Sequence, residues 1–97
     1  MKIVKVVGVA VATQKEPRLE GSKLLLVRET DPSGKETGKS FIAQDEVGAG
    51  PGELVLLVEG STARVASGDI NKPVDAVIVG ILDSLSVDDK ITYQKYG

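Results

Sequence analysis

The carboxylates are the side chains of this sequence that could do acid–base chemistry, because it contains no histidine and no cysteine. Histidine is the commonest general base and metal ligand, and cysteine is the usual thiolate ligand. The carboxylates near the ends of apolar segments are Asp45, Glu46, Glu53, Asp75 and Asp83. Nearby carboxylates are common by chance in a chain that is 27% charged, and these lack the spacing of a metal site. We therefore expect no catalytic residue, no metal and no cofactor.

A glycine-rich segment, Gly-Ala-Gly-Pro-Gly at residues 48–52, lies between acidic residues. Glycine permits backbone conformations with positive φ and proline removes a donor, so this segment is not helical. A phosphate-binding loop would end in Gly-Lys-Ser/Thr and lead into a helix. Here a five-residue apolar run begins at Leu54 instead, and the acidic neighbours would repel an anion. We expect a structural turn or a subunit contact; in the structural alternative, the Glu53 carboxylate accepts backbone N–H bonds from a neighbouring turn.

Charge and composition argue against two classes of partner. With 12 basic and 14 acidic residues the net charge is −2, which is unlike the basic surface that phosphate backbones require. One phenylalanine and two tyrosines are too few to form a stacking platform for single-stranded nucleic acid. No apolar run reaches the ~18 residues of a membrane span, and the start lacks a signal-peptide pattern. We expect a soluble intracellular protein that binds neither nucleic acid nor a membrane.

Five segments have the apolar pattern of β-strands, and a sixth near the end is weaker. The expected strands cover residues 2–13, 23–29, 39–47, 54–58 and 74–83, and residues 91–93 form a final short strand or part of an arm. Gly8 and Gly80 interrupt two of these strands, as at the bends of a sheet that curls into a barrel. Residues 31–34 have the proline and glycine of a type I turn, and residues 35–38 are expected to extend an exposed, mobile hairpin tip.

These elements predict an all-β fold with at most one short helix. Gly60, Ser61 and Thr62 are residues that favour a helix N-terminus, so one turn of helix is expected to begin there. The strands are expected to form a small OB-like barrel of five to six strands. The length predicts a single domain, residues 1–97, in which residues 84–97 are a variable tail or arm.

Three ordered blocks of the sequence resemble one known family. They cover residues 5–13 with 24–27, residues 45–64 including Asp-Glu-Val-Gly-Ala-Gly-Pro-Gly-Glu and Gly-Ser-Thr-Ala-Arg, and residues 73–81. Together they span about residues 1–84 and closely resemble the EutN/CcmL family of bacterial microcompartment shell proteins. The resemblance implies a structural protein rather than an enzyme, whose homo-oligomer is a pentamer. Such pentamers cap the vertices of a polyhedral shell, beside hexameric shell proteins, in the cytoplasm.

The resemblance also implies where functional residues lie. The residues expected at or near the subunit interface are Asp45, Gly48, Gly50, Gly52, Glu53 and Arg64. From its residue type alone, Arg64 is either a solvated side chain or a bidentate partner for a carboxylate across that interface. Gly60, Ser61 and Thr62 are expected to line a narrow central opening. The family usually has two serines there, so Thr62 would narrow the opening by a methyl group.

The alternative function is a small OB-like binding module for a soluble protein or ligand partner. A monomer at micromolar concentration would favour this alternative over a shell vertex.

Overall fold

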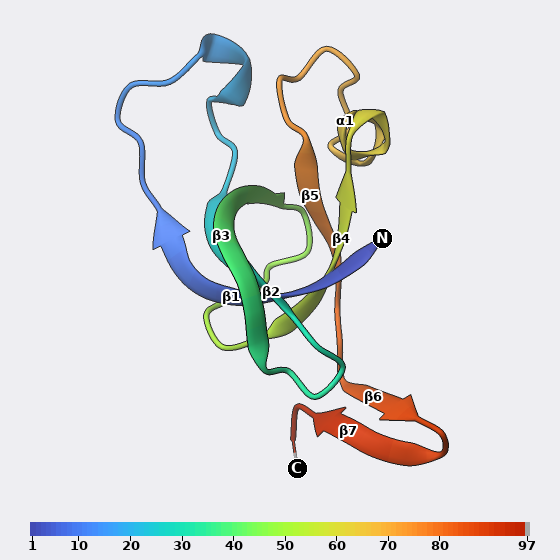
Figure 1. Ribbon diagram of the computed structural model, residues 1–97. Coiled ribbons are helices and arrows are strands. Elements are labelled where there is room, and N and C mark those ends of the chain that lie inside the picture. The colour runs from blue at the N-terminus through green and yellow to red at the C-terminus, as the bar shows by residue number, and fades with distance from the viewer. Residues whose placement is uncertain (97) are drawn as a thin grey trace.

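The computed structural model describes residues 1–96, in which short strands curl around one interior (Figure 1). The strands are β1 (Lys2–Ala10), β2 (Leu24–Thr30), β3 (Glu36–Asp45), β4 (Leu54–Glu59), β5 (Ala76–Ile81), β6 (Ser84–Val87) and β7 (Lys90–Gln94). The helices are a single 3-10 turn, η1 (Pro17–Leu19), and one α-helix, α1 (Ser61–Ala66). Neither helix of residues 1–96 is long and apolar enough to cross a membrane.

Five of the strands close into a barrel in the order β1-β2-β3-β5-β4, with β4 returning to β1. Neighbouring strands are antiparallel except β3 and β5, whose parallel pairing covers only Gln44 with Val77 and Asp45 with Ile78. A closed barrel of five strands with one short α-helix confirms the predicted fold class. The strands β6 and β7 form a separate two-stranded sheet outside the barrel.

The two glycines predicted to bend strands lie at irregularities of the barrel. The pairing of β1 with β2 shifts register between Val6 and Gly8. The pairing of β4 with β5 shifts next to the pair formed by Leu56 and Gly80. A β-carbon at Gly80 would lie only 3.3 Å from Leu56 Cδ1, so this glycine also permits close packing. Both positions fit the predicted bends, which let short strands close into a barrel.

Several element boundaries differ from the sequence-based prediction. Residues 36–38, expected as a mobile tip, belong to β3, because the turn at Asp31 closes immediately and Thr30 pairs with Glu36. The Asp31 carboxylate fixes that turn by accepting the backbone N–H groups of Ser33 and Lys35. The first strand ends at Ala10 and the fifth begins at Ala76, so both are shorter than expected. The predicted loop after the first strand contains η1.

The predicted tail, residues 84–97, is a β-hairpin as far as it is described. Its two strands join through Asp88 and Asp89, whose φ angles are 50° and 64°. Positive φ at both central residues is typical of the tight turns that match strand twist. The last residue of the tail, Gly97, lies outside the described residues.

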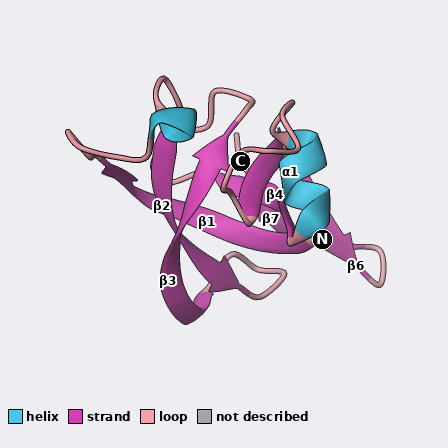
Figure 2. Cartoon of the chain, turned by 90° about the horizontal axis from the view of Figure 1, so that it is seen from above, coloured by secondary structure: helices cyan, strands magenta, loops and turns pink. Residues whose placement is uncertain are grey.

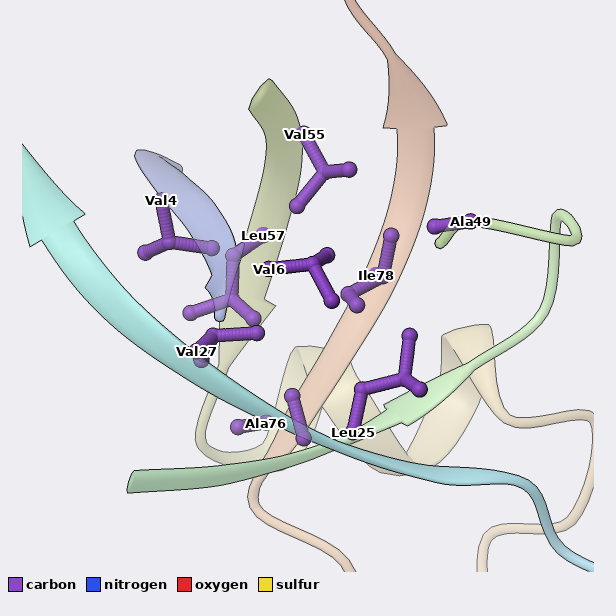
Figure 3. Packing of buried hydrophobic residues seen from close by; sticks show 10 residues of the cluster. Val4, Val6, Leu25, Val27, Ala49, Val55, Leu57, Ala76 and Ile78 are labelled. Atoms are coloured by element: carbon purple, nitrogen blue, oxygen red, sulfur yellow. The ribbon is translucent and has the colours of Figure 1, made fainter. Parts of the chain in front are cut away.

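The core of the barrel consists of aliphatic side chains that point inward from all five strands (Figure 3). Its buried members are Val4, Val6, Leu25, Val27, Ala43, Ala49, Val55, Leu57, Ala76 and Ile78. A smaller cluster of Val58, Ala63 and Val77 lies under α1, which packs beside β4 (Figure 2). Before its register shift β1 alternates, so Val4 and Val6 are buried whereas Ile3 and Lys5 are partly exposed.

We expect Ile78→Ala to lower the free energy of unfolding by about 2–5 kcal/mol, because it removes a fully buried side chain and leaves a cavity. The control is Ile70→Ala, since Ile70 is 66% exposed, and it should change stability by less than about 0.5 kcal/mol. Urea unfolding at one fixed protein concentration measures both. Equal losses in the two variants would contradict the placement of the core.

Candidate functional site

The loop between β3 and β4, residues 46–53 and here called the glycine loop, holds most of the predicted interface residues. Gly48 and Gly52 have φ angles of 78° and 90°, which L side chains rarely adopt. Ala49 lies between these two turns and is buried in the barrel core (Figure 3). At the other end, the backbone of Gly52 donates to Val6 O at 2.8 Å, and Val6 donates to Glu53 O at 2.9 Å. The loop is therefore fastened to the barrel at both its middle and its end.

Asp45 fixes the first half of the glycine loop from inside the protein. Its side chain is 1% exposed. Its Oδ1 accepts the backbone N–H of Val47 at 3.1 Å, and its Oδ2 accepts that of Ala49 at 2.9 Å. The Lys23 ammonium lies 3.3 Å from Oδ2 and donates to Ala49 O at 2.9 Å. A buried carboxylate with two backbone donors and a cation is fully engaged within its own subunit.

Glu53 fixes the second half in the same way. Its Oε1 accepts the backbone N–H of Gly50 at 2.6 Å, while its own backbone N–H donates to Gly50 O at 3.2 Å. Its Oε2 lies 2.6 Å from the Lys95 ammonium, at the end of the β6–β7 hairpin. The structural role considered for Glu53 from the sequence is thus present in the structure. Glu53 also links the glycine loop to the tail of the chain.

The ion pair of Glu53 and Lys95 shifts both titrations away from neutrality. The Lys95 ammonium, and next the Gly50 backbone N–H, hold the pKa of the Glu53 carboxyl below its usual 4.5. Hydrogen bonding to Glu53 and then to Tyr96 raises the pKa of Lys95 to about 12. Both groups are therefore charged across the whole neutral range.

Gly50 differs from the other two glycines of the loop. Its φ is outside the positive range, and a β-carbon there would meet only Glu53 Oε1, at the ordinary contact distance of 3.7 Å. Nothing within residues 1–96 therefore requires glycine at residue 50. A requirement for glycine there would have to come from outside the subunit.

The residues predicted for a central opening lie at the start of α1, away from the glycine loop (Figure 1). Gly60 is the N-cap, with a φ of 69°, and Ser61 and Thr62 are exposed without capping the helix through their side chains. Ala63 is fully buried and fastens the helix to the barrel. Arg64 is exposed, and its guanidinium forms no ion pair within residues 1–96.

The two lysines that complete the loop, Lys23 and Lys95, could not be predicted from the sequence. A lysine 22 or 42 residues from its carboxylate partner leaves no local signal, and only the fold brings the pairs together. Asp45 was predicted at or near the subunit interface, and its carboxylate is buried and bonded within its own subunit. No cluster of three side chains suited to a metal ion occurs within the described part of the chain. The site therefore provides a rigid surface formed by the glycine loop.

Comparisons with known proteins identify the family to which this chain belongs. The family model described as ethanolamine utilisation protein EutN/carboxysome matches residues 1–83. The chain is 44% identical to the carboxysome shell vertex protein CcmL of Gloeobacter violaceus, over 98% of this chain and 95% of that protein. The solved structure of Gloeobacter violaceus CcmL superposes with a TM-score of 0.93 at 43% identity and covers 100% of both chains.

Two further relatives come from other microcompartments. The shell vertex protein PduN of Salmonella typhimurium is 47% identical, over 89% of this chain and 99% of that protein. GrpN, a pentameric microcompartment shell protein from Rhodospirillum rubrum, superposes with a TM-score of 0.81 at 37% identity, covering 90% of this chain and 99% of that one.

We expect Asp45→Ala to destabilise the protein by about 2–3 kcal/mol, because two backbone N–H groups and the Lys23 ammonium lose their acceptor. The matched control is Asp83→Ala, since Asp83 is exposed and its side chain makes no hydrogen bond within residues 1–96. Urea unfolding measures both variants. A loss for Asp45→Ala no larger than for its control would show that the carboxylate does not hold the loop.

Glu53 should make stability depend on acid pH. Because its folded pKa lies below 4.5, its stabilising contribution is complete above pH 4.5 and is lost as the pH falls through the folded value. We expect the stability of the wild type to exceed that of Glu53→Gln by roughly 1–2 kcal/mol near pH 7, and this difference to shrink as the pH falls below the usual pKa of the carboxyl. In Lys95→Met the pKa of Glu53 should rise, so its stabilising contribution should begin to be lost at a higher pH. A difference that stays constant with pH would contradict this role.

Proposed function

This chain belongs to the EutN/CcmL family of microcompartment shell proteins, and we propose that it forms a closed ring of five copies at the vertices of a polyhedral shell. Its role is structural, as a shell vertex protein. The observation that carries the proposal is likeness along nearly the whole chain to a protein named as a shell vertex protein. We propose no catalytic activity for it.

The physical task of such a ring is to impose curvature. In a cyclic ring one surface of each subunit meets a different surface of the next, and the rotation per subunit sets how many copies close the ring. A ring of five within a layer of six-fold tiles bends that layer, because a flat hexagonal lattice has no place for a pentagon. We therefore propose hexameric shell proteins as its neighbours. The angle between subunits must be held rigidly for the ring to close at five.

We propose the glycine loop as part of the contact between copies. Its exposed surface contains Gly48 and Gly52, beside the partly exposed Gly50, so another backbone can approach closely without side chains intervening. Its shape is held by the carboxylates of Asp45 and Glu53, which act on the contact by positioning the loop. Support for this proposal comes from Gly50, because neither its φ nor its neighbours within residues 1–96 require a glycine there.

The start of α1 is proposed to face the axis of the ring. Gly60, Ser61 and Thr62 are exposed together there, so five copies would surround a narrow polar opening. Arg64 follows on the same helix with a guanidinium that forms no ion pair within residues 1–96. Its planar fork suits a carboxylate of the neighbouring copy, and we propose it as a contact residue.

We expect Gly50→Val to abolish the ring while the subunit keeps its fold. Native mass spectrometry should find about 51 kDa for wild type, which is five copies of the 10.2-kDa chain, and free subunits for the variant. The far-ultraviolet circular dichroism of the two should be the same β-rich spectrum. An unchanged oligomer mass in the variant would refute the contact at Gly50.

The wild-type mass tests the function itself. A wild-type chain that stays monomeric at micromolar concentration would overturn the vertex proposal and favour a small binding module.

A further inference from the structure

A hollow of about 160 Å³ lies on the outer face of the barrel, between η1 and the segment that leads into β5. Leu24 and Gln44 pair across β2 and β3, and they point outward because their neighbours Leu25 and Ala43 face the core. Gln44 is nevertheless only 2% exposed. The walls of the hollow are mostly apolar and consist of Leu19, Leu24, Ile42, Pro73, Val74 and Ala76.

Two acceptors distinguish this hollow from an apolar crevice. Gln44 donates its amide NH₂ to the Glu46 carboxylate, and because a carboxylate only accepts, this bond fixes the amide orientation. The other amide atom, Oε1, is buried and has no donor within residues 1–96. Asp75 also lines the hollow, and its exposed side chain forms no ion pair within those residues. Apolar walls beside such acceptors are complementary to a cation carried on an aliphatic stem.

An arginine side chain has this combination of properties. Its stem packs on apolar surface, and its planar guanidinium binds a carboxylate through two parallel hydrogen bonds. A cavity of about 150 Å³ accommodates benzene, so the hollow has room for such a stem. Of the three arginines of this chain, Arg18 and Arg28 form ion pairs with Glu16 and Glu36. Arg64 is exposed and forms none within residues 1–96.

Arg64 and the hollow lie at the same end of the subunit but on different sides of it. Figure 1 shows η1 and α1 at this end, with the loop before β5 between them, and Figure 2 shows the two helices apart when this end is seen from above. The backbone N–H of Gly60 donates to Asp75 O at 2.9 Å, so Asp75 lies beside the start of α1. Arg64 is about one helical turn further along. A cyclic ring requires two such different, complementary surfaces on each subunit.

We infer that the hollow is the binding site for Arg64 of the neighbouring copy. The stem of that arginine lies against the apolar walls, and its guanidinium binds the Asp75 carboxylate. The inference rests on the proposed function, in which the start of α1 faces the ring axis and Arg64 is a contact residue. It assigns the acceptor of Arg64 and gives the ring a repeated contact near the axis, in addition to the glycine loop.

The test exchanges the two charges. Arg64→Asp places a carboxylate against Asp75, and Asp75→Arg places a guanidinium against Arg64, so each single variant brings like charges together. We expect the protein concentration at which half of the subunits form rings to rise at least about tenfold in each single variant. In the variant with both substitutions it should return to within about threefold of the wild-type value, because the pair is restored. Sedimentation velocity over a dilution series measures this concentration.

The controls make the same changes of charge at exposed residues of the opposite end of the subunit (Figure 1). They are Lys90→Asp at the start of β7 and Asp83→Arg directly before β6. We expect each to leave the half-assembly concentration within about twofold of the wild-type value, since exposed charges outside a contact contribute little.

A further variant tests the hollow without changing a charge. Ile42→Trp places a larger side chain at its exposed edge, and an aromatic residue suits a strand, so the barrel should be retained. Val87→Trp on β6 is the matched control, since Ile42 and Val87 are both 44% exposed. We expect Ile42→Trp to raise the half-assembly concentration at least about tenfold by excluding Arg64, and Val87→Trp to leave it within about twofold.

The outcomes separate the inference from the proposed function. Circular dichroism first establishes that each variant keeps the β-rich spectrum. Weaker rings in the single charge variants, and their recovery in the exchanged variant, support the inference. Rings of unchanged stability in Arg64→Asp or in Ile42→Trp would overturn it, as would an exchanged variant no more stable than the single ones. A wild-type chain that forms no ring would instead overturn the proposed function.

Discussion

The backbone N–H groups of the glycine loop need acceptors, and this requirement organises the functional end of β3 and β4. Glycine has no side chain to supply an acceptor, and unpaired backbone donors are costly where water is excluded. Two carboxylates, one at each end of the loop, solve the problem: Asp45 accepts from Val47 and Ala49, and Glu53 accepts from Gly50. A lysine directly before β2, Lys23, and a lysine of the tail, Lys95, neutralise them. The glycine-rich segment, whose composition suggests flexibility, is thereby held in one conformation.

That rigidity is what the proposed contact between copies requires of the glycine loop. A contact between copies sets the rotation from one subunit to the next, so a contact surface that moves would allow rings of different sizes. Ala49 fastens the loop to the core, where close packing resists displacement. Preorganisation also lowers the conformational entropy lost when copies associate. The barrel supplies the rigid body, and the loop supplies a defined surface on it.

The sequence predicted the barrel well because its signals are local. Alternating aliphatic residues in β1 and the apolar run of β4 indicated strands, and Gly8 and Gly80 indicated bends, which the register shifts confirm. Glu53 was also predictable as an acceptor, since it lies three residues from its donor, Gly50. Asp45 was not, because its burial depends on β3 entering the barrel wall beside β5 over only two residue pairs. The lysine partners and the fixed direction of the tail depend on tertiary contacts that sequence spacing does not encode.

The charges that hold the loop also explain why its geometry resists changes of pH near neutrality. The chain contains no histidine, so none of its side chains has an unperturbed pKa between about 5 and 8. Within the loop, the same ion pair lowers the pKa of Glu53 and raises that of Lys95 to about 12, which widens the range over which both are charged. Reciprocal stabilisation of this kind makes each partner's charge state depend on the other being in place. In the proposed ring, a contact surface held by such a pair keeps its charges across the neutral pH range.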